Sequence, residues 1–170
     1  MKVLGGVVGL ATMATLSLPA VADARLHGEI FTRLCVETRA EVQAFSNRAR
    51  ALGAAPAQPL MPLEGEARNY TLSAGGHTFI ATAQTVVSAQ SANRQCVVMA
   101  PSAMPRPVEA QVTQALGFGT PFRRVDQGGN RFTLWTAGRV APGAEIALIE
   151  RVPRDNPSVT LSFQHVMARN

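Results

Sequence analysis

Cys35 and Cys96 are the only cysteines of the chain and the residues with the clearest potential for chemistry. A redox dithiol usually has the C-x-x-C spacing, whereas these two thiols lie far apart in the sequence. Zinc would need two further ligands at suitable spacing, and no second cysteine pair exists. A papain-like nucleophile would need a partner histidine and an electropositive setting. We therefore predict that Cys35 and Cys96 form a structural disulfide.

The predicted surroundings of the two cysteines support this pairing. Cys35 lies at the edge of the apolar stripe of a predicted helix, and Cys96 lies in "RQCVVMAP", a short apolar run typical of a buried strand. Closing a loop of roughly 60 residues would remove about 4 kcal/mol of unfolded-state freedom. The disulfide is expected to hold the helix on the sheet.

Three histidines, His27, His77 and His165, are available as ligands, and their spacing matches no recognised metal motif. We expect capping or rim positions for them and predict no metal and no cofactor. His77 is the best candidate contact for a ligand or partner, because it follows a Gly-Gly turn with accessible backbone amides.

Motifs of nucleophilic catalysis and phosphate binding are absent, including G-x-S-x-G, the P-loop and a G-x-G-x-x-G after a strand. We therefore predict no catalytic residues and favour a protein that is not an enzyme. The alternative is a small hydrolase or lyase whose site is assembled from distant residues, such as His77 with Glu145 or Glu150.

Four further residues are candidate ligand or partner contacts. Arg123, Arg124 and Arg131 flank "VDQGGN" and would suit an anion-binding loop, because arginine binds carboxylates in a bidentate manner. The alternative is a solvated loop in which Arg123 or Arg124 pairs with Asp126. Trp135 is either a core residue of a second layer or an exposed contact residue.

The N-terminal sequence has the three-part order of a secretory signal: one lysine, an apolar run over residues 3–18, and small residues with two A-x-A sites. The run is shorter than the about 20 residues that a membrane-spanning helix needs. We predict a signal peptide over residues 1–22, with cleavage after Ala22 or Ala24. The remaining chain, residues 23–170, is expected to be one globular domain, periplasmic or secreted, without a membrane span.

The formal net charge of +5 does not indicate a nucleic-acid partner. The only lysine is Lys2, and the arginines are spread evenly along the rest of the chain, whereas nucleic-acid binders gather their cations in one patch. One Trp and one Tyr offer few stacking surfaces. Abundant alanine and arginine with almost no lysine is typical of GC-rich bacterial coding.

Hydrophobic periodicity predicts an α+β domain of order α-βββ-α-βββ. Two helices, at residues 27–52 and 105–119, are expected to pack against an antiparallel sheet of five to six strands. Loops are expected at residues 53–68 and 120–130. The strands are predicted within residues 69–87 (two strands around Gly75-Gly76), 94–101, 131–140, 145–152 and 158–166. This order is compatible with an internal duplication, although no residue-level repeat supports one.

The combination of "IFTRLCVET", "AFSNRARALG", a distant "QCVVMAP", a helix ending in "ALGFG" and a late tryptophan strand resembles small exported bacterial proteins of unknown function. The resemblance implies export and a cysteine pair and adds no site. We predict an exported protein that acts by binding, as an envelope accessory protein or a protein-partner module. An inhibitor or immunity-type protein, using residues 54–68 or 123–130, is a further alternative.

Overall fold

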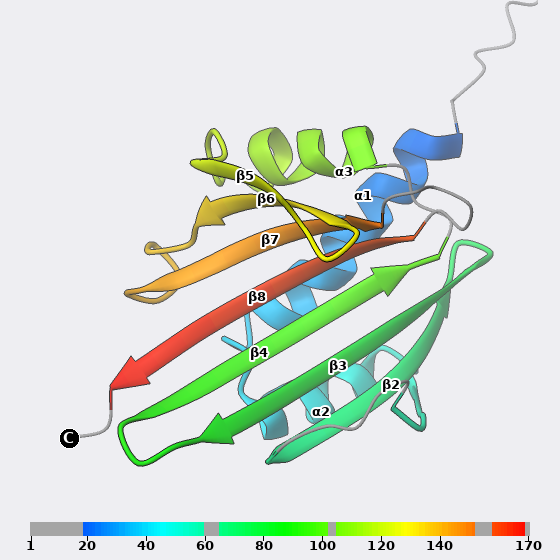
Figure 1. Cartoon of the computed structure of the whole chain (residues 1–170). Helices are drawn as coiled ribbons and strands as arrows, with labels where there is room; N and C mark the ends of the chain where they lie inside the picture. The colour runs from blue at the N-terminus through cyan, green and yellow to red at the C-terminus, as the bar shows by residue number, and fades with distance from the viewer. Residues whose placement is uncertain (1–18, 60–64, 102–104, 152–157, 169–170) are drawn as a thin grey trace, which may run out of the picture.

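The computed structural model describes residues 19–59, 65–101, 105–151 and 158–168, and side chains from residue 23 onward. Most of the predicted signal peptide and part of the predicted loop 53–68 lie outside the described residues. The described chain is an α+β fold in which three α-helices cover one face of an eight-stranded sheet (Figure 1). No helix in these ranges is long and apolar enough to cross a membrane.

The first half of the chain contains two α-helices, one π-helical turn and four strands. In chain order the elements are α1 (Pro19–Phe31), η1 (Thr32–Val36), α2 (Val42–Ala51), β1 (Ala55–Pro56), β2 (Glu66–Ala74), β3 (His77–Val87) and β4 (Ser91–Ala100). The second half contains one α-helix, one π-helical turn and four strands. These are α3 (Pro105–Ala110), η2 (Gln111–Ala115), β5 (Arg123–Gln127), β6 (Asn130–Thr136), β7 (Ala144–Arg151) and β8 (Val159–Ala168).

The predicted strand number was wrong: the sheet has eight antiparallel strands, in the order β1-β2-β3-β4-β8-β7-β6-β5. The two extra strands, β1 and β5, are the edges and lie within the predicted loops. Residues 123–127 are mostly exposed and show no apolar alternation, so backbone pairing with β6 alone defines that strand. Such edges carry no hydrophobic signal.

The helical part of the prediction was also wrong, because the first helix is divided. Arg39 and Ala40 have positive φ angles of 52° and 55°, which end the π-helical turn and turn the chain. A new helix, α2, then begins with Glu41 as its N-cap, whose carboxylate accepts the backbone N–H groups of Gln43 (3.0 Å) and Ala44 (2.6 Å). A carboxylate at this position satisfies amides that have no partner within the helix.

The core lies between the helices and one face of the sheet. Cys35 in η1 and Cys96 in β4 are fully buried there and joined by a disulfide, with a Cα–Cα distance of 5.4 Å. The predicted disulfide is thereby confirmed. It fixes the helical layer to the centre of the sheet. The largest fully buried side chains are Trp135, Tyr70, Phe31, Phe45, Phe79, Phe163, Leu34, Ile146, Leu148, Leu161, His27 and Val42.

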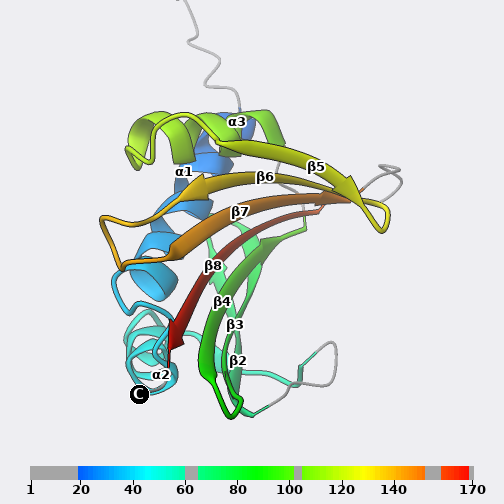
Figure 2. The same cartoon turned by 60° about the vertical axis from the view of Figure 1, so that its left-hand side comes forward.

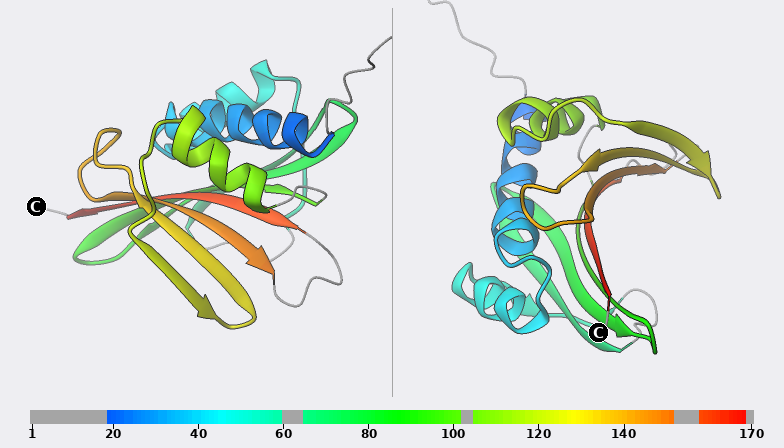
Figure 3. Two further views of the ribbon diagram at one scale, coloured as in Figure 1. Left: turned by 90° about the horizontal axis from the view of Figure 1, so that it is seen from above. Right: turned by 90° about the vertical axis from the view of Figure 1, so that its left-hand side faces the viewer.

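Each half of the chain contributes four consecutive strands, β1 to β4 and β5 to β8, and in each half they run in sequence from one edge of the sheet to the central β4–β8 pair. The two halves therefore have the same strand arrangement. The pairs Tyr70–Ala81 and Ala81–Val98 recur 65 residues later (70 to 135, 81 to 146) as Trp135–Ile146 and Ile146–Phe163. A helical segment precedes each four-strand unit. Because β4 and β8 are antiparallel, the halves are related by an approximate two-fold axis through the centre of the sheet. The helical segments of both halves lie on the same side of the sheet (Figure 3).

The equivalent aromatic residues of the two halves have equivalent roles. Tyr70 packs edge-on against Phe45 of α2 at a ring distance of 5.8 Å. Trp135 is fully buried, and its Nε1 donates a hydrogen bond to Thr113 Oγ1 of η2 at 3.2 Å. Each therefore anchors its own half of the sheet to the preceding helical segment. The opposite face carries no helix, and the sheet curves around it (Figure 2).

Candidate functional site

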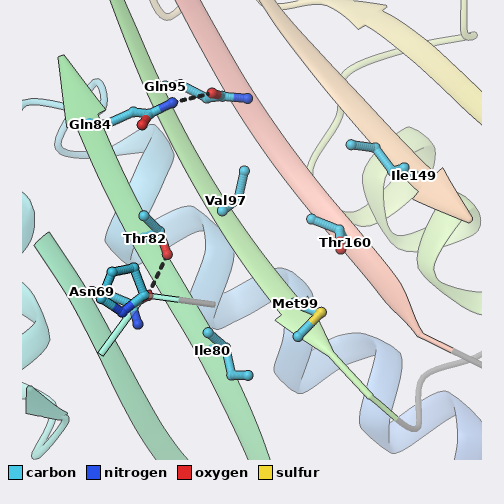
Figure 4. Close-up of a pocket in the computed structure, with 10 residues that line it drawn as sticks. Asn69, Ile80, Thr82, Gln84, Gln95, Val97, Met99, Ile149 and Thr160 are labelled. Carbon is cyan, nitrogen blue, oxygen red and sulfur yellow. Dashed lines mark hydrogen bonds between the residues drawn. The ribbon is translucent and has the colours of Figure 1, made fainter. Parts of the chain in front are cut away.

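A cavity of about 320 Å³ hollows the helix-free face of the sheet (Figure 4). This volume lies at the lower end of the range for small-molecule sites, about 300–1,000 Å³. None of the described lining residues carries a charge, although the chain as a whole has a net charge of +5. The lining residues are Pro59, Asn69, Ile80, Thr82, Gln84, Gln95, Val97, Met99, Ile149 and Thr160.

Strand alternation places these side chains. Successive residues of a strand point to opposite faces, so the neighbours of the buried core residues in β3 and β4 must point away from the helices. Three residues of β3 and three of β4 therefore form the cavity floor, all half-buried: Ile80, Thr82, Gln84, Gln95, Val97 and Met99. The floor is held by the most firmly anchored part of the sheet, since Cys96 lies between two of these positions.

Two side-chain pairs supply the polar groups of the cavity. Gln84 Nε2 donates to Gln95 Oε1 at 2.8 Å, a bond that does not use the Gln84 oxygen or the Gln95 amide hydrogens. Thr82 Oγ1 donates to Asn69 Oδ1, and Asn69 Nδ2 donates to the carbonyl oxygen of Gln58 at 2.8 Å. The second pair ties the chain after β1 to the sheet and so fixes the wall at Pro59.

The candidate contacts from the sequence lie outside this cavity lining. His77 Nε2 is 2.7 Å from Asp23 Oδ1 of α1. Arg124 pairs with Glu109 of α3, and Arg131 Nε donates to Asp126 Oδ1 at 3.1 Å. These two arginines therefore contact acids of the same chain.

The two remaining candidates are also separate from the cavity. Arg123 lies in the exposed edge strand β5, and Trp135 lies in the core without exposed surface. Glu145 and Glu150, the carboxylates considered as partners of His77, lie on β7. Strands β4 and β8 lie between β7 and β3, so three strand spacings, roughly 14 Å, separate the strand of these carboxylates from the strand of His77.

The one titratable group with a large pKa shift among the described residues lies on the helix side of the sheet. His27 is fully buried, and this burial lowers the pKa of its imidazole to about 4, although a hydrogen bond to the Val98 carbonyl opposes the shift. The Nε2–O distance is 2.8 Å. Within the described ranges, no group of three or more His, Cys, Asp or Glu side chains is arranged to hold a metal ion.

Sequence reasoning missed the cavity residues. The run "QCVVMA" predicts a buried strand, yet only Cys96, Val98 and Ala100 are in the core. The signal available was the alternation of Ile80, Thr82 and Gln84 with small core residues in β3. It could identify an outward face but could not show that this face is hollowed.

Comparisons with protein-family models, with curated proteins and with solved structures find no match for this chain. The functional interpretation therefore depends on the geometry of the site itself.

Proposed function

We propose that this chain is an exported, disulfide-stabilised binding protein whose helix-free sheet face takes up a small, uncharged, partly apolar ligand. The observation that carries the proposal is the cavity, whose described lining is uncharged and combines apolar side chains with two polar side-chain pairs. Apolar surface provides affinity, and a few fixed polar groups orient a ligand. The role fits an accessory protein of the cell envelope better than catalysis, because no titratable group is among the described residues that line the cavity.

The binding proposal predicts that filling the cavity abolishes binding of a neutral apolar dye. Nile red is expected to bind the wild-type protein with 1:1 stoichiometry. Val97 lies on the cavity floor, and Val97→Trp places a large ring in the cavity, so the dye affinity should fall at least about tenfold, the effect of losing roughly 1.4 kcal/mol of contacts. Fluorescence titration measures this change.

Val166→Trp is the matched control. Val166 lies on the same face of the neighbouring strand β8, is 51% exposed and does not line the cavity. This variant receives the same ring and should bind the dye like the wild type. Equal losses in the two variants, or no dye binding by the wild type, would exclude the cavity as a ligand site.

The export part of the proposal is supported by the signal-like N-terminal sequence and by the disulfide, which is compatible with an oxidising compartment. The contacts of two residues support cleavage after Ala22 over cleavage after Ala24. Asp23 contacts His77, and Ala24 is only 3% exposed in the core. Cleavage after Ala24 would remove both residues, whereas cleavage after Ala22 keeps both and leaves an acid at the helix N-terminus, where negative charge is favourable.

We therefore expect the exported protein to begin at Asp23. Intact-mass analysis and N-terminal sequencing of the protein recovered from a periplasmic or culture fraction measure this directly. A protein that begins at Arg25 would show that the Asp23–His77 contact does not decide the processing site. A protein that keeps residues 1–22 would instead argue against export.

A further inference from the structure

Two rows of side chains cross the helix-free face, each formed by directly paired residues of β3, β4, β8 and β7. The apolar row consists of Ile80, Met99, Thr160 and Ile149. The polar row consists of Gln84, Gln95, Gln164 and Glu145. The rows lie four residues apart along each strand, about 13 Å. Between them is a middle row of smaller side chains, Thr82, Val97, Ser162 and Ala147.

The approximate two-fold axis of the fold exchanges the two rows. The offset of 65 residues relates Ile80 to Glu145 and Met99 to Gln164, and it relates Gln84 to Ile149 and Gln95 to Thr160. The middle row is related to itself. At three of these four equivalent pairs, one half thus carries an apolar side chain where the other half carries a polar one, whereas Gln95 and Thr160 are both polar. Packing of the fold does not require this difference, because the rows face away from the helices.

We propose that the cavity binds a single-chain amphiphile lying along the strands, with its apolar chain on the apolar row and its head group on the polar row. This inference rests on the proposed function and adds the ligand class and its direction. The middle row leaves room for a narrow chain to cross, since its side chains are small. The cavity lining includes members of both rows, so one ligand can contact both.

The polarity of the rows also defines the head group. The Gln84–Gln95 pair offers an unused acceptor and unused donors, which suits hydroxyl groups. No cation lines the cavity among the described residues, and the polar row ends at Glu145, which would repel an anion. The head group is therefore not anionic, and the glutamine pair favours a hydroxyl-bearing group, as in a monoacylglycerol.

The test uses 1-hexanoylglycerol, 1-octanoylglycerol and octan-1-ol at monomeric concentrations, titrated by calorimetry into the full processed protein. A buried methylene contributes about fourfold in affinity, so the two extra methylenes of octanoylglycerol should raise its affinity about fifteenfold over hexanoylglycerol. One or two hydrogen bonds to the glycerol head should make octanoylglycerol bind up to about tenfold more tightly than octan-1-ol.

Two variants at equivalent positions separate these contributions. Ile149→Gln should reduce the chain-length effect to less than about threefold while keeping the preference for the glycerol head. Gln84→Ile should bring octanoylglycerol and octan-1-ol to the same affinity while keeping the chain-length effect. Each variant places at one position the residue that the equivalent position already carries. Met99→Gln and Gln164→Met repeat the test at a second equivalent pair if a first variant does not fold.

The outcomes distinguish this inference from the proposed function. In one outcome, Val97→Trp removes octanoylglycerol binding, whereas Ile149→Gln and Gln84→Ile change it alike or not at all. This outcome overturns the proposed direction of the ligand along the strands and keeps the binding cavity. Nile red binding without octanoylglycerol binding overturns the ligand class alone. Failure of both probes overturns the inference and the proposed function together.

Discussion

The Cys35→Ala/Cys96→Ala variant is expected to lose about 4 kcal/mol of unfolding free energy, the largest effect that we predict for any substitution. The disulfide spans 61 positions, and a loop of this length restricts the unfolded chain by about that amount in the chain-entropy model. Typical domains have net stabilities of only about 5–15 kcal/mol. The variant should therefore unfold about 10–15 °C below the wild type.

Urea unfolding of the wild type and of the double variant, each with and without reductant, measures the loss of unfolding free energy. The reduced wild type should match the double variant, and reductant should not change the double variant. Because both sulfurs are fully buried, reduction of the wild type should require prior unfolding. Coincident unfolding curves for oxidised wild type and double variant would show that the disulfide does not stabilise the helix-to-sheet contact.

The parts of the fold that could be predicted are those with local signals. The hairpin at Gly75-Gly76 follows from two alternating strands around a turn that needs positive φ, and both glycines have it. The division of the first helix has no such signal. The apolar spacing continues from Leu34 through Ala40 to Val42, all buried, so the pattern resembles one continuous helix although the backbone turns.

The sequence predicts the repeated layout of the two halves only through the order of the helices and strands. The residues that correspond in the two halves are mostly different, since burial and strand pairing are shared while side-chain identity is not. One short repeat does mark it: Ala-Leu-Gly at 51–53 and again at 115–117, where Gly53 and Gly117 have positive φ after a helical segment. Three residues of this kind also end many unrelated helices, and the repeat becomes informative only beside the strand register.

Local sequence patterns could not predict the candidate site, for a different reason. The Gly-Gly turn before His77 and the anion-binding capacity of Arg124 and Arg131 predict contacts there, but the structure places each of these side chains beside an acid of the same chain. The cavity instead consists of residues that are unremarkable singly, such as Gln84 and Met99. Their meaning depends on which strands are neighbours and on the curvature of the sheet, which are properties of the whole chain.

Acidification is expected to weaken the folded state through His27. In the folded protein its pKa is about 4, whereas in the unfolded chain it returns to about 6.5. Between these values the unfolded state binds more protons, so stability is full above pH 6.5 and decreases as the pH falls toward 4. The difference of about 2.5 pKa units corresponds to a loss of about 3 kcal/mol.

The geometry explains why the folded state resists this proton. Nε2 donates to the Val98 carbonyl, and among the described residues Nδ1 has no hydrogen-bond partner. Protonation would therefore place a charge at a buried nitrogen beside the Phe79 ring, 5.8 Å from the imidazole. The charged form is instead favoured in the unfolded chain, where water solvates both nitrogens.

Urea unfolding at pH 7 and at pH 4 gives the loss of unfolding free energy of each variant over this range. Comparing this loss between a variant and the wild type cancels the contribution of the carboxylates, which both proteins share. His27→Gln keeps a donor for the Val98 carbonyl but cannot be protonated, so it should lose about 3 kcal/mol less than the wild type over this range. His165→Gln leaves His27 in place and should lose as much as the wild type. If His27→Gln and the wild type lose the same amount, burial of His27 does not couple folding to pH.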